Sequence, residues 1–436
     1  MIMWRKQLIR YLPAILAFLG VCLSTVDHVI DNVLPGRYEI TSLIIVSLVF
    51  VFNGLAVGWL IKKQVNLKDE LQTIFNNVDA TIWSVDLKRK SFKVSAGIEK
   101  MYGIPHREFT DNLSLWQNVT HPDDWPELAQ AQAEVRRGKS VILERRIVKP
   151  DQQIVWVRDH LTPLSDQDGN LDKIIGIATD ISQIKEHEMR LTQDLQRAAG
   201  IQNSLLPAEF PTGTGIKVAW QFKPCAYVGG DMFNIYPLDQ RRSWFYICDV
   251  SGHGVAAALR AVTVSYFLKP GAPVDNGQAV QELRPGDVMA YLNQKFAGQL
   301  DGGFITLFLG VLDRENRQLT YARAGHCPPL LVSAAGAVQL LSKGQPPIGL
   351  FPEVEYQDYE VKLQAGDKLI LYTDGVTEAF DRQREQFGEK RLEEMAAENS
   401  CLPIDQLTAT IVRAVAAHAD GAEQQDDLAI LGIEVI

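Results

Sequence analysis

The sequence is poor in cysteine and has no excess of basic residues. Five cysteines are scattered over 436 residues, and no two form a C-x-x-C pair. This excludes a disulfide framework or a zinc cluster and favours a reducing compartment for most of the chain. The formal net charge is -10, and an acidic chain is a poor non-specific binder of nucleic acid. Hydrophobic residues make up 46%, which excludes intrinsic disorder and, with the length, predicts roughly two to four folded units.

Two apolar runs near the N-terminus depart from this composition. Residues 40–61 carry no charged side chain, and about 20 apolar residues suffice for a helix to cross a bilayer. A shorter run precedes them, and we take the two spans as about 8–26 and 40–61. Basic residues flank the pair and mainly acidic ones lie between: Arg5, Lys6, Arg10, Lys62, Lys63 and Lys68 outside, and Asp27, Asp31, Glu39 and Arg37 inside.

This charge pattern predicts that residues 1–68 form a membrane anchor of two transmembrane helices with both ends in the cytoplasm. A cleaved signal peptide is the alternative for the first run, but no small-x-small cleavage site follows Val26. We therefore expect a multi-pass protein of the cell membrane whose remaining domains are cytoplasmic.

Residues 69–183 predict a small α/β domain, opened by an amphipathic helix over 67–78. Alternating or apolar stretches predict strands at 81–86, 91–95, 141–149, 153–164 and 172–182, the last three as an antiparallel meander. Helical patterns lie between the second and third strands. The segments HPDDW, WVRDH and GIATDISQIKEHE resemble a PAS domain.

The PAS resemblance implies a sensor of a small ligand, light or redox state, or a module for dimerisation. No cysteine lies between residues 69 and 224, so a cysteine-adduct flavin photosensor is excluded. His106, His121 and His160 are candidate haem ligands, but we favour surface or turn positions for them.

The next segment, residues 184–206, predicts a helical linker. Steps of four and three residues give a partial heptad seam: Ile184, Glu188, Leu191, Leu195, Ala198, Gln202 and Leu205. We favour a parallel dimeric signalling helix over the alternative, a monomeric connector that lies on the next domain.

Residues 207–436 carry the candidate chemistry, and their apolar stretches 303–313 and 318–332 predict central strands. Four strand-like stretches begin or end at an acidic residue, two of them directly beside glycine: the aspartates are Asp231, Asp249, Asp374 and Asp426. Carboxylates without Lys or Arg neighbours repel one another unless a cation joins them. Hard oxygen ligands select Mg²⁺ or Mn²⁺ over zinc, and two such ions can activate one water for attack on phosphorus.

The same segment resembles the SpoIIE-type branch of the metal-dependent PPM (2C-type) serine/threonine phosphatases. The motifs that carry the resemblance stand in family order: VGGDMFN, CDVSGHGVAAAL, FITLFLGVLD, YARAGHCPPLL, PPIGL, LILYTDGVTEAFD, FGEKRL and QQDDLAIL. The preceding IQNSLLP is similar to the segment that leads into environmental-stress phosphatases of the RsbU kind.

The resemblance implies an α/β/β/α sandwich with two Mn²⁺ or Mg²⁺ ions between its sheets. It implies that Asp231 binds one metal directly or through water. It further implies that Asp249 bridges both ions with help from the Val250 carbonyl, and that Asp374 and Asp426 hold the second ion. Asp427 is a further candidate ligand, although related phosphatases often have Asn there. The nucleophile would be a metal-held hydroxide, with no covalent enzyme intermediate.

Other interpretations of individual residues fit less well. His253 stands where the family often has Lys, and Cys327 where it often has Asn; for His326 we favour a structural role over a catalytic one. No basic residue stands at a spacing from Cys327 that would indicate an activated thiol, which argues against a cysteine phosphatase. GGDMF lacks the second acid of a diguanylate cyclase, and no ATP-binding motif of a histidine kinase follows the linker.

The predicted architecture is thus a membrane anchor (1–68), a PAS domain (69–183), a helical linker (184–206) and a phosphatase domain (207–436). The resemblance implies a PAS-regulated protein serine/threonine phosphatase acting on a small STAS-type anti-sigma-factor antagonist. We expect a homodimer formed through the PAS domain and the linker. The alternative is a non-catalytic signalling scaffold that binds the same partner.

Overall fold

The computed structural model describes residues 51–52, 54–67, 80–89, 91–95, 97–112, 115–207, 215–274 and 278–436. The predicted span 8–26 lies outside them, as do most of the span 40–61 and the amphipathic helix 67–78. Residues 51–52 and 54–67 are helical. Among the described residues, no helix combines the length and the apolar character needed to cross a membrane. The chain divides into two compact units, residues 1–187 and 188–436.

The first unit contains a five-stranded antiparallel sheet in the order β2-β1-β5-β4-β3. Its strands are β1 (Ala80–Asp86), β2 (Ser91–Val94), β3 (Val141–Val148), β4 (Ile154–Ser165) and β5 (Leu171–Asp180). Between β2 and β3 lie α3 (Gly97–Tyr102), α4 (His106–Asp111), α5 (Leu115–Asn118) and α6 (Trp125–Arg136). The predicted strands and the meander β3-β4-β5 are confirmed.

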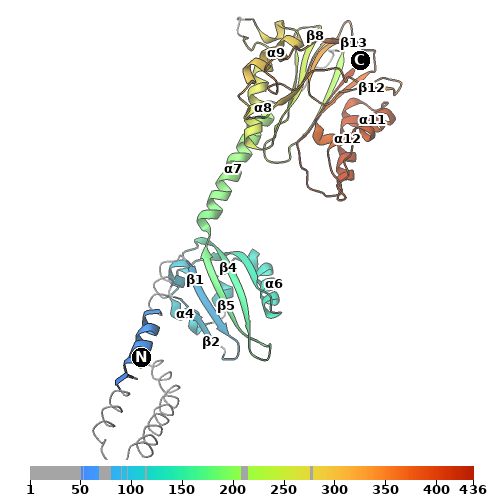
Figure 1. Ribbon diagram of the computed structural model, residues 1–436. Coiled ribbons are helices and arrows are strands. Elements are labelled where there is room, and N and C mark those ends of the chain that lie inside the picture. The colour runs from blue at the N-terminus through green and yellow to red at the C-terminus, as the bar shows by residue number, and fades with distance from the viewer. Residues whose placement is uncertain are drawn as a thin grey trace, which may run out of the picture. The chain divides into compact units, whose positions relative to one another are not determined.

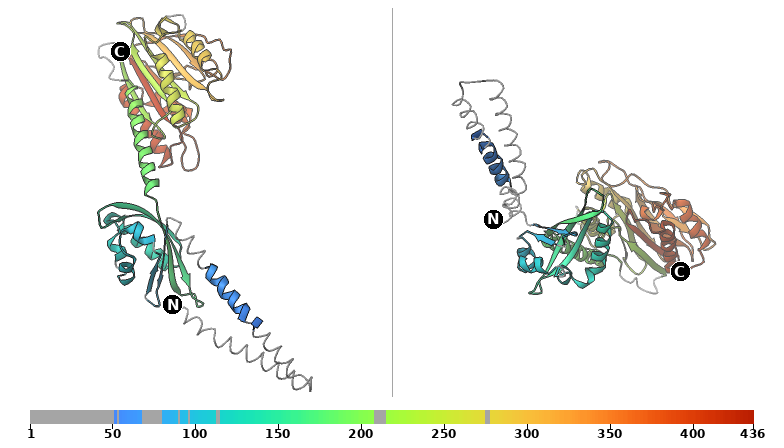
Figure 2. Two further views of the ribbon diagram at one scale, coloured as in Figure 1. Left: turned by 90° about the vertical axis from the view of Figure 1, so that its left-hand side faces the viewer. Right: turned by 90° about the horizontal axis from the view of Figure 1, so that it is seen from below.

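The helices between β2 and β3 cover one face of this sheet, and no helix among the described residues of this unit covers the other (Figure 2). Along β4, Val155, Val157 and Leu161 are buried, whereas Ile154, Arg158 and His160 on the opposite face are exposed. This alternation is what a half-covered antiparallel sheet requires, because successive side chains point to opposite faces.

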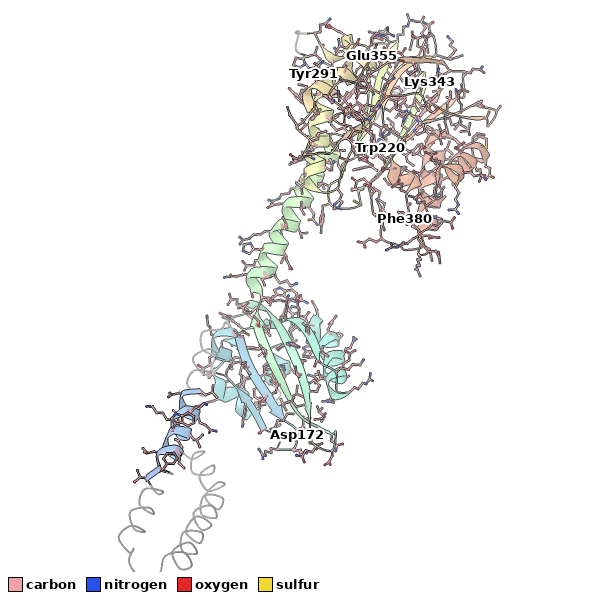
Figure 3. The ribbon with its side chains drawn as sticks, in the orientation of Figure 1. Asp172, Trp220, Tyr291, Lys343, Glu355 and Phe380 are labelled. Atoms are coloured by element: carbon pink, nitrogen blue, oxygen red, sulfur yellow. The ribbon has the colours of Figure 1, made fainter. Side chains whose placement is uncertain are left out.

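The linker is helical, as predicted, in α7 (Ser182–Ser204). Leu191 on the predicted seam is 62% exposed, and side chains stand out from the middle of α7 (Figure 3). Two seam positions do not fit a dimer seam, because they engage the second unit: Gln202 is buried, and Leu205 just beyond the helix packs on that unit's core.

The second unit contains two five-stranded sheets. One has the order β13-β10-β9-β8-β7, with β7 (Met232–Pro237), β8 (Arg242–Val250), β9 (Ile305–Asp313), β10 (Gln318–Ala324) and β13 (Tyr359–Lys362). The other has the order β12-β11-β14-β15-β6, with β6 (Ile216–Lys223), β11 (Leu330–Val332), β12 (Val338–Leu340), β14 (Lys368–Tyr372) and β15 (Leu428–Val435).

The sheets face each other across a shared core and are covered outside by helices (Figure 1). The first sheet contacts α8 (Val255–Leu268) and α9 (Pro285–Phe296); the second contacts α11 (Glu389–Glu398) and α12 (Ile404–Ala419). The short helix α10 (Asp374–Thr377) follows β14 directly. The arrangement is the α/β/β/α sandwich that the resemblance implied.

One stretch that we expected to be central strand, residues 318–332, is divided between the two sheets. It runs along β10 and then, after a break, along β11. The break contains Gly325 at φ +63°, followed by Pro328 and Pro329. A left-handed glycine turns the chain, and proline cannot donate to a ladder, so the chain leaves one sheet and enters the other.

Gly310 in β9 tests how tightly the core is packed. A Cβ at this position would lie 2.5 Å from Cζ of Phe245, which is itself fully buried. We expect Gly310→Ala to destabilise the second unit by about 1–3 kcal/mol, the usual effect of overpacking, as measured by calorimetric unfolding. Gly200→Ala, which meets nothing within 4 Å on α7, is the control. Equal transition temperatures for the two variants would contradict the packing described.

Candidate functional site

Antiparallel pairing brings the aspartates at the strand ends to common edges. Met232 of β7 pairs with Cys248 of β8, so Asp231, just before β7, lies beside Asp249 near the end of β8. Tyr372 of β14 pairs with Ile430 of β15 in the other sheet. Because one strand starts where its antiparallel neighbour ends, Asp374 and Asp426 also come to a common edge. The predicted positions at strand ends are thus confirmed.

Thr373 joins the two sheets at this edge. Its Oγ1 donates to Oδ2 of Asp231 at 2.7 Å, and the backbone N–H of Ala429 donates to the same hydroxyl at 3.0 Å. Thr373 and Asp231 are both buried. One hydroxyl therefore fixes the carboxylate of Asp231 relative to β14 and β15.

Asp231 is buried and Asp249, Asp374 and Asp426 are partly buried, and the pKa values of all four are raised. Burial, and then the charges of Asp374 and Asp426, raises the pKa of Asp249 to about 8. Burial and the charge of Asp426 raise the pKa of Asp374 to about 6. The pKa of Asp231 is raised mainly by burial and then by Asp249. Among the described residues, the charged groups that shift the pKa of Asp249 are all carboxylates.

This donor set fits a divalent cation, because a cation would relieve the repulsion that raises these pKa values. The side chains offer hard oxygen ligands, and the Val250 carbonyl oxygen adds another at the end of β8, 2.8 Å from where a Gly230 Cβ would stand. In the described part of the chain, no group of three or more His, Cys, Asp or Glu side chains is arranged so that it could hold a metal ion by itself. Mg²⁺ sites often use only one or two carboxylates and keep several waters.

Asp427 has a different set of contacts from its neighbours. Its Oδ1 accepts the N–H of Cys225 at 2.8 Å, and its Oδ2 accepts the N–H of Gly230 at 2.5 Å. It is 2% exposed. Both oxygens thus support the loop that leads to Asp231, and a role for Asp427 as a metal ligand stays a prediction.

Two glycines permit these close contacts. A Cβ on Gly375 would lie 1.9 Å from the carbonyl oxygen of Asp427, and one on Gly229 would lie 2.4 Å from Oδ2 of the same residue. Neither position has room for a side chain. The Asp-Gly and Gly-Gly-Asp patterns therefore reflect close packing of backbone around Asp427.

The two histidines of interest differ in environment. His326 is 2% exposed, and its Nδ1 lies 2.9 Å from Oγ1 of Thr306. Burial and then the charge of Arg323 lower the pKa of His326 to about 3, so its ring is neutral at neutral pH, which supports a structural role. His253 is exposed in the loop before α8. Burial raises the pKa of Asp426, and the nearby His253 opposes part of that rise.

The cysteine environments agree with the argument against a cysteine nucleophile. Burial, followed by the charges of Asp374 and Asp249, raises the pKa of the Cys327 thiol to about 12. Burial and Asp427 raise that of Cys225 to about 11. Thiols that stay protonated are weak nucleophiles.

A cavity of about 350 Å³ opens beside Asp426. Its lining includes Lys223, Glu378, Phe380 and Gln424, and Phe380 lies toward the periphery of the unit in Figure 3. Polar and apolar groups thus line a cavity that reaches Asp426.

A second cavity, of about 260 Å³, lies inside the PAS unit. Trp83, Phe92, Trp116 and Leu143 line it together with Asp159. Oδ2 of Asp159 accepts from Nε of buried Arg145 at 2.7 Å, whereas Oδ1 has no partner among the described residues. No histidine is among the lining residues in the described part of the chain, and His160 is exposed, so the cavity gives no support to haem ligation.

Sequence reasoning missed two residues of the site. Thr373 lies in the motif LILYTDGV, beside Asp374, and Gln202 lies in IQNSLLP. The side-chain amide of Gln202 bonds both backbone groups of Gly229. Neither residue is acidic, so a search for metal ligands does not find them.

Comparison with known proteins agrees with this division of the chain. Residues 239–436 match the family model of stage II sporulation protein E (SpoIIE), and residues 91–178 match that of the PAS fold. Asp231 lies eight residues before the start of the SpoIIE match at residue 239. The chain therefore carries a SpoIIE-type phosphatase domain after a PAS domain, as the motifs indicated.

Three curated relatives are similar over part of their length. Protein IcfG of Synechocystis sp. is 28% identical over 280 residues, 58% of this chain and 42% of IcfG. Phosphoserine phosphatase RsbP of Bacillus subtilis is 27% identical over 44% of this chain and 47% of RsbP. Phosphoserine phosphatase RsbU of the same organism is 25% identical over 51% of this chain and 65% of RsbU. The chain thus spans about half the length of the curated relatives it matches.

The contact of Thr373 with Asp231 can be tested by an isosteric change. Thr373→Val removes the hydroxyl. Oδ2 of Asp231 then loses this donor, and the N–H of Ala429 loses this acceptor. We expect a loss of about 1–3 kcal/mol in the free energy of unfolding, the cost of unsatisfied buried polar groups, measured by urea titration. Thr263→Val is the control, because Thr263 is exposed on α8 and its hydroxyl bonds only Leu259 of the same helix. A loss no larger than the control's would show that the hydroxyl does not hold the site.

Proposed function

We propose that this chain, in which a SpoIIE-type phosphatase domain follows a PAS domain, is a protein serine/threonine phosphatase controlled by its PAS domain. The observation that carries the proposal is the group of buried and partly buried aspartates at the edges of two sheets, whose pKa values are raised by desolvation and by one another. A cation would relieve the repulsion within this group. The unit that carries the group is a SpoIIE-type phosphatase domain.

In this proposal Asp231, Asp249, Asp374 and Asp426, with the Val250 carbonyl, hold two Mn²⁺ or Mg²⁺ ions. Bound divalent ions would supply Lewis-acid activation of a water and neutralise phosphate charge. Thr373 keeps Asp231 in place, and Asp427 holds the loop before it. The cavity beside Asp426 would receive the phosphorylated side chain and its neighbours.

For the substrate we propose a phosphoserine or phosphothreonine on a small STAS-domain antagonist of an anti-sigma factor. Two similar proteins bear the name phosphoserine phosphatase, and the motifs resemble phosphatases of environmental stress. Dephosphorylation would let the antagonist capture the anti-sigma factor and release a sigma factor.

We also propose attachment to the cell membrane through residues 8–26 and 40–61, with the PAS and phosphatase domains in the cytoplasm. The described part of the second span exposes large apolar side chains, such as Phe52 at 75% and Trp59 at 61%. The Lys63 ammonium stands 5.0 Å from the centre of the Trp59 ring, and Trp and Lys are common at the edge of a bilayer.

Dimerisation is the remaining element of the proposal. On the open face of the PAS sheet, Ile142 and Ile177 flank His160 across β3, β4 and β5. The two isoleucines are 65% and 43% exposed. This apolar row, together with exposed Leu191 on α7, favours a partner copy of the chain. The PAS cavity, in turn, offers a place for a small sensed ligand.

Phosphatase activity and a scaffold role predict different outcomes. We expect the chain to release phosphate from a phosphoserine peptide with Mn²⁺, and Asp249→Asn to lower kcat by about a hundred-fold or more, the effect of losing one charged group that stabilises the transition state. EDTA should abolish the activity, and Mn²⁺ should restore it. Asp301→Asn is the control, because Asp301 is exposed and its φ of 50° suits asparagine.

Activity that survives both EDTA and Asp249→Asn would overturn the metal mechanism. No phosphate release by the wild-type chain would favour the scaffold. Phosphosite mapping on proteins retained by the Asp249→Asn chain would then test the STAS-type substrate.

The membrane proposal predicts that the chain sediments with membranes and is not extracted from them by alkaline carbonate. Val51→Arg combined with Leu55→Arg should release it, because an arginine near the centre of a span costs about 2.5–3.5 kcal/mol. Leu67→Arg, beyond the predicted span but also on an exposed apolar residue, is the control. A wild-type chain recovered without detergent in the supernatant would refute the anchor.

A further inference from the structure

The end of α7 makes a specific polar contact with the loop that leads to Asp231. Nε2 of Gln202 donates to the carbonyl oxygen of Gly229 at 2.7 Å, and the N–H of Gly229 donates to Oε1 of Gln202 at 3.1 Å. The side-chain amide thus pairs with both backbone groups of one residue, as a neighbouring strand would. We call this pair of hydrogen bonds the Gln202 clamp.

Burial makes the Gln202 clamp important for the position of the loop. Gln202 is 3% exposed and is the one buried residue of α7, all of which the structure describes. Gly229 and Gly230 are buried as well. Water therefore cannot readily replace the clamp, and without it both backbone groups of Gly229 would lack their partner.

The loop is held from two sides. Asp427, before β15, accepts the N–H groups of Cys225 and Gly230, while Gln202 holds Gly229 between them. Asp231 follows two residues after Gly229, and its own carboxylate accepts from Thr373. Of these contacts, only the Gln202 clamp comes from the linker helix.

The end of α7 is itself anchored in the phosphatase unit. Nδ2 of Asn234 on β7 donates to the carbonyl oxygen of Leu205 at 2.6 Å, and Leu206 is part of the core. The C-terminal end of α7 and the residue after it thus contact the chain on both sides of Asp231. Gln202 bonds Gly229 before the aspartate, and Leu205 bonds Asn234 after it. A shift of α7 along or about its axis would have to move Gly229, break the clamp, or both.

We propose that Gln202 is a positioning residue through which the linker helix sets the place of Asp231 in the site. This inference rests on the proposed phosphatase function and names a contact by which the PAS domain can control it. With the clamp made, Asp231 is held for catalysis; with the clamp broken, residues 225–231 loosen while the sheets stay folded.

The test compares Gln202→Met with Gln196→Met in the full chain. Methionine keeps the length of glutamine but cannot make the clamp, and Gln196 is an exposed residue of the same helix. For Gln202→Met we expect a fall of about ten- to hundred-fold in kcat on a phosphoserine peptide, with KM changed less than about two-fold. Gln196→Met should behave like the wild type.

Hydrogen exchange without added metal gives a readout independent of activity. We expect the amides of residues 225–231 to exchange at least about ten times faster in Gln202→Met, and those of β15 to keep their wild-type rate. Gln202→Glu keeps an acceptor for the N–H of Gly229 but loses the donor to its carbonyl oxygen. The exchange rate of residues 225–231 in this variant should therefore lie between those of the wild type and Gln202→Met.

Each other outcome counts against the clamp. Unchanged exchange in residues 225–231 would overturn it, and so would exchange that rises equally in β15, since Gln202 would then support folding as a whole. A fall in kcat without faster loop exchange would also overturn it. If the wild-type chain releases no phosphate, the proposed function fails, and the exchange data alone still decide whether Gln202 positions the loop.

Discussion

Repulsion between carboxylates that are buried or partly buried is the constraint on which the phosphatase unit depends. Asp231 and Asp249 lie side by side at the edge of one sheet, and Asp374 and Asp426 at the edge of the other. Burial penalises each charge, and each neighbour adds to the penalty. Side chains that repel one another stay together only on a stiff frame. The two sheets and their shared core provide it.

The frame near the site consists largely of contacts with backbone groups. Asp427 and Gln202 both bind amides of residues 225–230, and Gly375 lets the chain pass against Asp427. Hydrogen bonds to backbone set the position of a loop whatever its side chains are. The loop before Asp231 is consequently tied both to Asp427, just before β15, and to the linker helix.

Most of the elements could be predicted from the sequence, because periodicity and turn residues are local signals. The five strands of the PAS unit, the helix α7 and the aspartates at strand ends were found in this way. Two expectations failed in part for the same physical reason. Residues 318–332 divide between two sheets, and the heptad pattern of α7 includes Gln202 and Leu205, which engage the phosphatase unit. A local pattern shows that a residue has a partner and leaves open which partner it is.

The sequence by itself determined that acidic residues stand at strand ends, that a long uncharged run precedes the PAS unit, and that the motifs are those of a SpoIIE-type phosphatase domain. Only the tertiary structure decided which carboxylates meet, that Thr373 joins the sheets, and that Asp427 and Gln202 hold the loop. The reason is distance along the chain. Asp231 and Thr373 are 142 positions apart, and Cys225 and Asp427 are 202 apart, so these contacts exist only when both sheets have formed.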